Sequence, residues 1–478
     1  MTIDNLKVHL QNGGQILKSR DDQDLVLLTH DASPANIDKP FKVLAESHCT
    51  WVKPEEAFGT EKLRSRIEPW LTALVQSEHL SVLVGSGLTH AIHMLGVGTP
   101  LPGMNAVAFQ VLNAEIAREV KRVASAAGRE DGNFEDQVRV ANELLRGLEI
   151  LNADKDDDST GRQQADRLRR DLSKISESFA QSVLQGEHSI ATTEAANREK
   201  AFIYLVSFLM SFASRAGTRE RLHLFTTNYD RFIEAGADAA GLRLIDRFVG
   251  TLAPVFRASR LDVDLHYNPP GIRGEPRYLE GVARFTKLHG SVDWLDSEGS
   301  IRRIGLPFGA KDPKPYLEAP GLSGVDASSL MIYPNAAKDR ETAAFPYVEL
   351  FRDFAASICR PNSTVVCYGY SFGDEHINRV IEDMLTIPSA HLVIISHSDP
   401  LGRIIQTYER LGRHAQITLL LGNQLGDLRA LVDHYLPKTA IDRTTFRMAE
   451  LLKARWGTDP RSNSEAENPD SATGNPVS

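Results

Sequence analysis

Short apolar runs alternate with helical patterns in two parts of the chain. Each run is rich in Val, Leu, Ile and Phe and is bounded by Gly, Pro, Asn or Asp, which is typical of a buried strand. Helical segments lie between several runs, and this alternation indicates a parallel sheet covered by helices on both faces. The sequence therefore predicts an α/β fold. The predicted strands lie within His79–Ile92, Arg221–Asp230, Val282–Trp294, Ser329–Pro334, Ser363–Leu385, His391–Ser398 and Gln416–Gly422.

A different pattern occupies the region from about Ala106 to Ala216. It contains no strand-like run, and Ala, Leu, Glu, Arg and Lys dominate it. Apolar residues recur at intervals of three and four, for example at Phe109, Leu112 and Ile116, so they share one helix face. We therefore expect a helical insertion of about four helices.

These patterns divide the chain into four parts. The sheet domain takes residues 76–105 and 218–440, and the helical insertion takes 106–217. Residues 1–75 carry no recognisable motif, so their role is unknown. Residues 441–478 are predicted to form a C-terminal helix and a disordered tail, because the tail is polar and rich in Pro, Gly and Ser.

Charge and cysteine content exclude several classes of protein. The 63 acidic residues outnumber the 54 basic ones, giving a net charge of -9, so direct nucleic-acid binding is not expected. Cys49, Cys359 and Cys367 form no CxxC pair, so we predict no disulfide framework and no zinc site. The chain shows no signal peptide and no apolar run of the roughly 20 residues that a membrane span needs. We expect a soluble protein of the reducing cytoplasm.

The unusual polar groups each follow a predicted strand, and in an open parallel sheet ligands bind beyond the carboxyl ends of the strands. The first group is GSGLT. Its residues Gly85, Ser86 and Gly87 would let the backbone approach a phosphate. The motif is only GxG and lacks the third glycine of the dinucleotide fingerprint, so a tight structural turn remains the alternative.

The second group is TTNYD. Asn228 is suited to hold a ribose hydroxyl or a water, and Asp230 is suited to accept a hydrogen bond from a carboxamide. The alternative is an Asx-type turn in which Asp230 caps the following helix.

Two further groups follow later strands. His289 in KLHGS is a candidate base, since imidazole titrates near neutral pH, although a structural histidine is the alternative. The segment GYSFGDEHIN offers Gly369 and Ser371 to a phosphate or ribose. It can also be simply a helix start with Asp374 near the cap.

Taken together and in this order, VLVGSGLT, FTTNYD, KLHGS and YGYSFGDEHIN resemble the motifs of the sirtuin superfamily. They look most like its bacterial sirtuin-like branch found in antiphage defence systems. The similarity covers about residues 78–95 and 220–425. It implies a Rossmann-like domain that binds NAD, as substrate, across its strand ends.

The resemblance also implies roles for individual residues. Asn228 would sit beside the nicotinamide ribose, and His289 would be the base that acts on a ribose hydroxyl. Gly85, Ser86 and Gly87 would form the pyrophosphate loop. Gly369, Ser371 and Asp374 would lie near the adenosine half of NAD. The implied NAD-binding residues are Gly85, Ser86, Gly87, Thr227, Asp230, Gly369, Ser371 and Asp374.

The chain departs from sirtuin deacetylases in three ways. Those enzymes carry a four-cysteine zinc module after the HG motif, and three scattered cysteines cannot build one. No PDFR-like segment follows GSGLT, so part of the nicotinamide pocket is unassigned. Asn228 and His289 are 61 positions apart (289 minus 228), wider than in the deacetylases. Without the zinc module, water becomes the simplest acceptor and no metal is expected.

The resemblance thus implies an NAD+ glycohydrolase that yields nicotinamide and ADP-ribose and depletes NAD in antiphage defence. ADP-ribosyl transfer, cyclisation and a non-catalytic nucleotide-sensing subunit remain alternatives. Homo-oligomers, and in some systems a HerA-type hexameric ATPase, are the partners that it implies.

Overall fold

The computed structural model describes most of the first 438 residues. The described residues are 2–31, 33–34, 36–53, 56–101, 107–126, 132, 134–157, 159–215, 219–259, 263–267, 277–297, 299–317, 322 and 345–438. The described residues up to Pro437 form one compact unit. The predicted strand at Ser329–Pro334 and the predicted C-terminal helix and tail lie outside the described residues.

An eleven-stranded sheet organises the compact unit, in the order β4-β3-β2-β1-β17-β16-β15-β5-β6-β12-β7. The seven strands from β17 to β7 are parallel, and this confirms the predicted α/β fold with its parallel sheet. The parallel strands are β5 (His79–Val84), β6 (His223–Thr226), β7 (Arg243–Ile245), β12 (Val282–Lys287), β15 (Ser363–Tyr368), β16 (His391–Ser396) and β17 (Ile417–Leu421).

The first 75 residues extend this sheet. β1 pairs antiparallel with β17, and β2, β3 and β4 continue outward, each antiparallel to its neighbour. The segment to which the sequence assigns no role therefore covers one edge of the parallel sheet, which would otherwise expose unpaired backbone groups. The strands are β1 (Gln15–Lys18), β2 (Val26–His30), β3 (Phe41–Val43) and β4 (Ala57–Phe58).

Helices cover both faces of the sheet because its strands are apolar on both sides. In β5, Leu80, Val82 and Val84 join one buried cluster, whereas Leu83 joins another. The first cluster includes residues of α2 (Thr60–Val75), α3 (Ser86–Gly96), α7 (Ala195–Ala213), α8 (Phe232–Ala240), α13 (Leu428–Ala430) and η5 (Leu431–Tyr435). The second includes residues of α1 (Ile3–Gln11), α10 (Tyr347–Ile358), α11 (Glu375–Leu385) and α12 (Arg403–Leu411).

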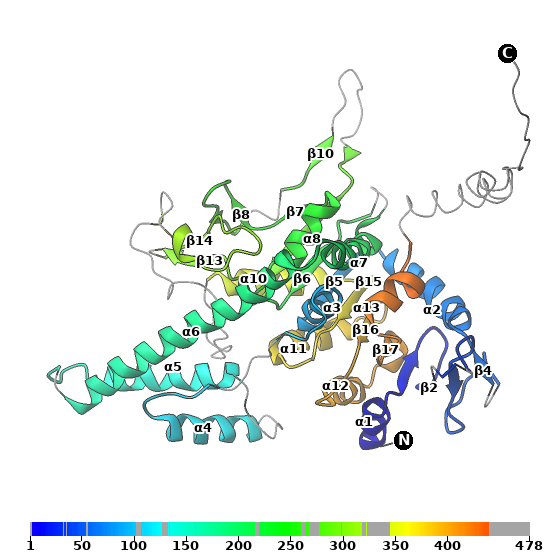
Figure 1. Cartoon of the computed structure of the whole chain (residues 1–478), viewed down its shortest axis with the longest axis horizontal. Helices are drawn as coiled ribbons and strands as arrows, with labels where there is room; N and C mark the ends of the chain where they lie inside the picture. The colour runs from blue at the N-terminus through cyan, green and yellow to red at the C-terminus, as the bar shows by residue number, and fades with distance from the viewer. Residues whose placement is uncertain are drawn as a thin grey trace, which may run out of the picture. The chain divides into compact units, whose positions relative to one another are not determined.

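Among the described residues between β5 and β6, four helices follow α3, namely α4 (Asn113–Ala126), α5 (Phe134–Leu151), α6 (Thr160–Thr192) and α7. Helices α4, α5 and the first half of α6 share a core of their own. Helix α6 continues from this core back to the sheet domain (Figure 1). Helix α7 packs against α3 and α8 instead, so the predicted insertion includes one helix of the sheet domain.

Smaller elements complete the described structure. A separate four-stranded sheet has the order β13-β14-β9-β8, and β10 pairs with β11. These elements are β8 (Phe248–Val249), β9 (Val255–Phe256), β10 (His266–Tyr267), β11 (Arg277–Tyr278), β13 (Trp294–Ser297), β14 (Ser300–Arg303), η2 (Lys314–Tyr316) and η4 (His414–Gln416).

The strand order reverses between β5 and β15. From β5 the chain continues to β6 on one side, whereas β15, β16 and β17 build the sheet on the other side. At such a switch point the loops that follow the two central strands diverge and leave a crevice beyond their carboxyl ends. The GSGLT and GYSFGD segments are those two loops.

Candidate functional site

The loops after β5 and β15 approach each other so closely that only glycines fit. A Cβ atom on Gly85 would lie 2.4 Å from the carbonyl oxygen of Gly369, and one on Gly87 would lie 2.5 Å from the Cα of Gly369. Gly369 itself has φ +60°, a conformation that glycine adopts without strain. The three glycines predicted to bind NAD therefore also have a structural task, which is to let two backbones meet at the switch point.

Helix α3 begins at this contact. Gly85 is its N-cap and provides no side-chain cap for the first amides. The amide of Gly87 donates to the carbonyl of Gly369 at 3.0 Å. This amide is therefore hydrogen-bonded within the protein, although the resemblance assigns Gly87 to the pyrophosphate loop. An uncapped helix start with Ser86 as its first residue still favours an anion, because the helix dipole is positive there.

Asn228 lies just beyond β6, and its side-chain orientation is well defined. Its Nδ2 donates to the carbonyl oxygen of Gly85 and to the hydroxyl oxygen of Thr89, both at 3.0 Å. A carbonyl can only accept, so this side of the amide must be the nitrogen. Both Nδ2 hydrogens are thereby used, and Oδ1 is the atom through which Asn228 can accept a hydrogen bond from a ligand.

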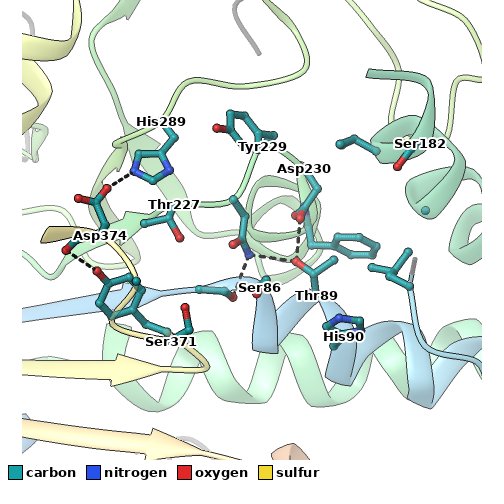
Figure 2. A pocket seen from close by; sticks show the side chains of 18 of the residues that line it. Ser86, Thr89, His90, Ser182, Thr227, Tyr229, Asp230, His289, Ser371 and Asp374 are labelled. Carbon is teal, nitrogen blue, oxygen red and sulfur yellow. Dashed lines mark hydrogen bonds and ion pairs between the residues drawn. The ribbon is translucent and has the colours of Figure 1, made fainter. Parts of the chain in front are cut away.

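Thr89 also connects Asn228 to Asp230. Its hydroxyl donates to Oδ2 of Asp230 at 2.7 Å (Figure 2). Oδ1 of Asp230 accepts the amide of Phe232 at 3.3 Å. The Asx-type turn proposed as the alternative role of Asp230 is therefore present at the start of α8, and Asp230 also lines the cavity described below. Burial raises the pKa of Asp230, while the nearby Lys287 ammonium and the Thr89 hydroxyl act in the opposite direction.

His289 follows β12 and contacts Asp374. Its Nε2 lies 2.8 Å from Oδ2 of Asp374, and both side chains are largely buried (Figure 2). The other oxygen of Asp374 caps α11 by accepting the amide of His376 at 2.9 Å. The resemblance places Asp374 near the adenosine half of NAD, whereas in the structure its carboxylate contacts the candidate base.

One cavity of about 270 Å³ brings most of the predicted site together. Asn228 and His289 both line it, as the proposal of a common site requires. In the view of Figure 2, His289 and Asp374 lie on one side of the cavity and Ser182 of α6 on the other. The predicted residues that line it are Gly85, Ser86, Thr227, Asn228, Asp230, His289, Ser371 and Asp374.

A second cavity of about 630 Å³ adjoins the first. Gly87 and Gly369 line this larger cavity rather than the smaller one. The loops after β16 and β17 contribute Asp399 and Asp427. The residues that line both cavities are Ser86, His90, Tyr370 and Ser371.

Several residues of this site are not among those predicted from the sequence. Thr89 lies one helical turn after Gly85, and this spacing could have identified it as part of the same helix face. Phe179, Ser182 and Val183 of α6 also line the smaller cavity. No motif marks them, because a long amphipathic helix can place any of its faces against a site.

A buried ion pair anchors α6 beside this site. Glu187 is fully buried, and its carboxylate accepts the backbone amide of Arg231 at 2.8 Å as well as two bonds from the guanidinium group. Arg231 also donates to the carbonyls of Leu306 and Pro307. The ion pair joins the insertion helix to the residue that follows Asp230.

The described residues contain neither a metal-ligand cluster nor a membrane-spanning helix. Among the described residues, no group of three or more His, Cys, Asp or Glu side chains could hold a metal ion. Within the same residues, no helix combines the length and apolar character needed to cross a bilayer. Cys49, Cys359 and Cys367 are free thiols.

Part of the chain is similar to known proteins. Residues 222–419 match the family model of the SIR2-like domain. This match confirms the resemblance to sirtuin-like proteins for that part of the chain, and it indicates an NAD-related activity in the general sense. No curated protein matches the chain. A solved structure described as "The Structural basis of Sirtuin Substrate Affinity" has 14% identity and a TM-score of 0.33, and the match covers 76% of this chain and 96% of that chain.

Proposed function

We propose that this protein is an NAD+ glycohydrolase that cleaves the bond between nicotinamide and ribose. The observation that supports this best is the shared cavity of Asn228 and His289, which lies at the switch point of a parallel sheet. The two cavities that meet at Ser86 suit a two-part ligand. Their volumes are of the order found for small-molecule sites, about 300–1,000 Å³.

In the proposed complex, NAD lies across the start of α3. The pyrophosphate is near Ser86, where the helix dipole favours negative charge. The adenosine half occupies the larger cavity, where the carboxylates of Asp399 and Asp427 can accept hydrogen bonds from ribose hydroxyls. The nicotinamide riboside half occupies the smaller cavity, with the carboxamide toward Asp230.

The proposed reaction consumes one water per NAD. The glycosidic bond breaks with its electron pair passing to nicotinamide, and the ribose becomes cationic. Oδ1 of Asn228 accepts from a ribose hydroxyl or from the attacking water, and His289 takes a hydroxyl proton. Water then adds to the ribose carbon and releases one proton, and His289 returns its proton to the ribose oxygen, which yields ADP-ribose. Orientation and electrostatics, with no covalent nucleophile, provide the acceleration.

We further propose, on the resemblance alone, that the enzyme depletes NAD in antiphage defence. An unrestrained NADase would harm its host, so activity would depend on assembly. Homo-oligomers and a HerA-type ATPase partner are the proposed assemblies. The proposal includes no direct contact with nucleic acid or membrane.

Incubation of the purified protein with NAD, with and without a candidate ATPase partner, tests the function. We expect release of nicotinamide and ADP-ribose in equal amounts, and a loss of at least about 100-fold in Asn228→Ala and in His289→Ala. Ser178→Ala is a control from α6 that does not line the smaller cavity. Full activity of both site variants would refute the assignment.

Chromatography of the products separates the alternatives. A cyclic product would indicate cyclisation in place of hydrolysis, and an ADP-ribosylated acceptor would indicate transfer. Tight NAD binding without turnover, even with partners present, would instead support a nucleotide-sensing subunit.

A further inference from the structure

We propose that Asp374 is the positioning residue of His289, and that it determines which imidazole nitrogen accepts a proton. The effect on rate rests on the proposed NAD cleavage. The effect on the imidazole itself follows from the contacts alone and can be measured without turnover.

The pair joins distant parts of the fold. Asp374 and His289 are 85 positions apart, and β5 and β6 lie between their strands in the sheet. Their contact of 2.8 Å is shielded, because the side chains of His289 and Asp374 are 13% and 4% exposed. A shielded carboxylate at this distance restrains an imidazole more than an exposed one would.

The position of Asp374 is itself restrained. Its Oδ1 accepts the amides of His376 and Ile377, which caps α11. The hydroxyl of Tyr370 lies 3.2 Å from the Asp374 carbonyl oxygen and 3.1 Å from Oδ1 of Asn378. The loop after β15 therefore holds the carboxylate with Oδ2 directed at His289.

This geometry selects one tautomer. An ionised carboxylate only accepts hydrogen bonds, so Nε2 of His289 carries the hydrogen and donates to Asp374. In the neutral imidazole, Nδ1 then has the free electron pair. When Nδ1 takes the proton of a ribose hydroxyl, the hydroxyl oxygen keeps the bonding electrons. The new positive charge lies beside the Asp374 carboxylate.

The contacts of Asp374 argue against the role that the motif resemblance implies. Asp374 lines the smaller cavity with His289 and does not line the larger one, which we assign to the adenosine half. Its two oxygens face His289 and the first amides of α11. Carboxylates that accept a hydrogen bond from an imidazole fix its tautomer and orientation, and for metal-bound histidines the loss of such a partner typically costs about 10–100-fold in activity.

Two substitutions separate orientation from helix capping. Asn and Ser cap helices about as well as Asp, so Asp374→Asn and Asp374→Ser should keep the unfolding midpoint of the wild type. In D374N, the oxygen stays on the α11 amides and the amide nitrogen donates to Nε2, which reverses the tautomer. In D374S, the side chain is too short to reach His289. Glu375→Gln is the matched control, because Glu375 is exposed and pairs with Arg379 on the helix surface.

Two measurements on the purified protein test whether Asp374 positions His289. Histidine 15N shifts report the tautomer, and the signal absent from His289→Gln identifies His289. We expect hydrogen on Nε2 in the wild type and on Nδ1 in D374N. We also expect kcat for NAD cleavage to fall about 100-fold in D374N and D374S, with KM changed less than about threefold, while E375Q matches the wild type.

The outcomes distinguish this inference from the proposed function. An unchanged tautomer in D374N, or a reversed tautomer with an unchanged kcat, overturns the positioning role. If the wild type cleaves no NAD but D374N still reverses the tautomer, the geometric inference stands and the proposed function fails.

Discussion

Removing the Glu187 carboxylate should destabilise the protein far more than removing an exposed carboxylate from the same helix. Glu187 is fully buried and Arg231 is 6% exposed, so Glu187→Ala leaves a guanidinium in the interior without its counter-charge. Three hydrogen bonds to the carboxylate disappear, and only those to the carbonyls of Leu306 and Pro307 remain. Breaking one partner of a buried pair costs about 3–5 kcal/mol.

Glu177 provides the matched control. It lies on α6 and pairs with Lys314 at 2.7 Å, but the Lys314 and Glu177 side chains are 62% and 49% exposed. Such a pair contributes about 0–1 kcal/mol. We therefore expect E187A to lower the urea midpoint by about 1 M and E177A to leave it nearly unchanged.

Two further observations complete this test. Replacing both buried partners, in Glu187→Met with Arg231→Met, should recover most of the loss, because no unpaired charge remains. Hydrogen exchange should increase in E187A along the part of α6 that carries Phe179 and Ser182, which line the cavity. Equal midpoints for E187A and E177A would refute the view that this ion pair anchors α6.

Three other substitutions test the site and the fold. Gly87→Ala should abolish NAD cleavage and lower the stability of the protein, because the new Cβ would lie 2.5 Å from the backbone of Gly369. Gly147→Ala is the control, because open space surrounds Gly147; thermal unfolding should show this variant to be neutral or stabilised by up to about 1 kcal/mol. Thr89→Val should reduce kcat about tenfold or more, because it removes the hydroxyl that connects Asn228 to Asp230. Thr89→Ser keeps the hydroxyl and should keep the wild-type kcat. Equal kcat values for the Val and Ser variants would contradict this role. Burial lowers the pKa of His391 from 6.5 to about 4, so the unfolded chain takes up this proton first and stability should fall as the pH drops from about 6.5 to 4. His391→Gln should remove about 3 kcal/mol of that pH dependence, because the pKa shift of 2.5 units corresponds to 1.36 kcal/mol per unit. An unchanged slope of stability against pH in this variant would show that another group is responsible.

The strands and the edge at which the site lies could be predicted from the sequence. A strand buried on both faces needs a continuous apolar run, and the predicted runs that the structure describes contain β5, β6, β12, β15, β16 and β17. Parallel strands end at the same edge of a sheet, so polar residues that follow them, such as Asn228 and His289, converge without any further information. The motif resemblance added the ligand class, and the match of residues 222–419 to the SIR2-like domain agrees with it.

The partners of these residues were decided by the tertiary structure. The contact between Asp374 and His289 spans 85 positions, and the ion pair of Glu187 with Arg231 spans 44. Local pattern cannot encode such contacts, because they depend on strand order and on the path of every intervening loop. The same applies to the antiparallel strands of the first 75 residues. These strands have ordinary strand patterns. Their place in the sheet is determined by the edge of β17, which would be exposed without β1.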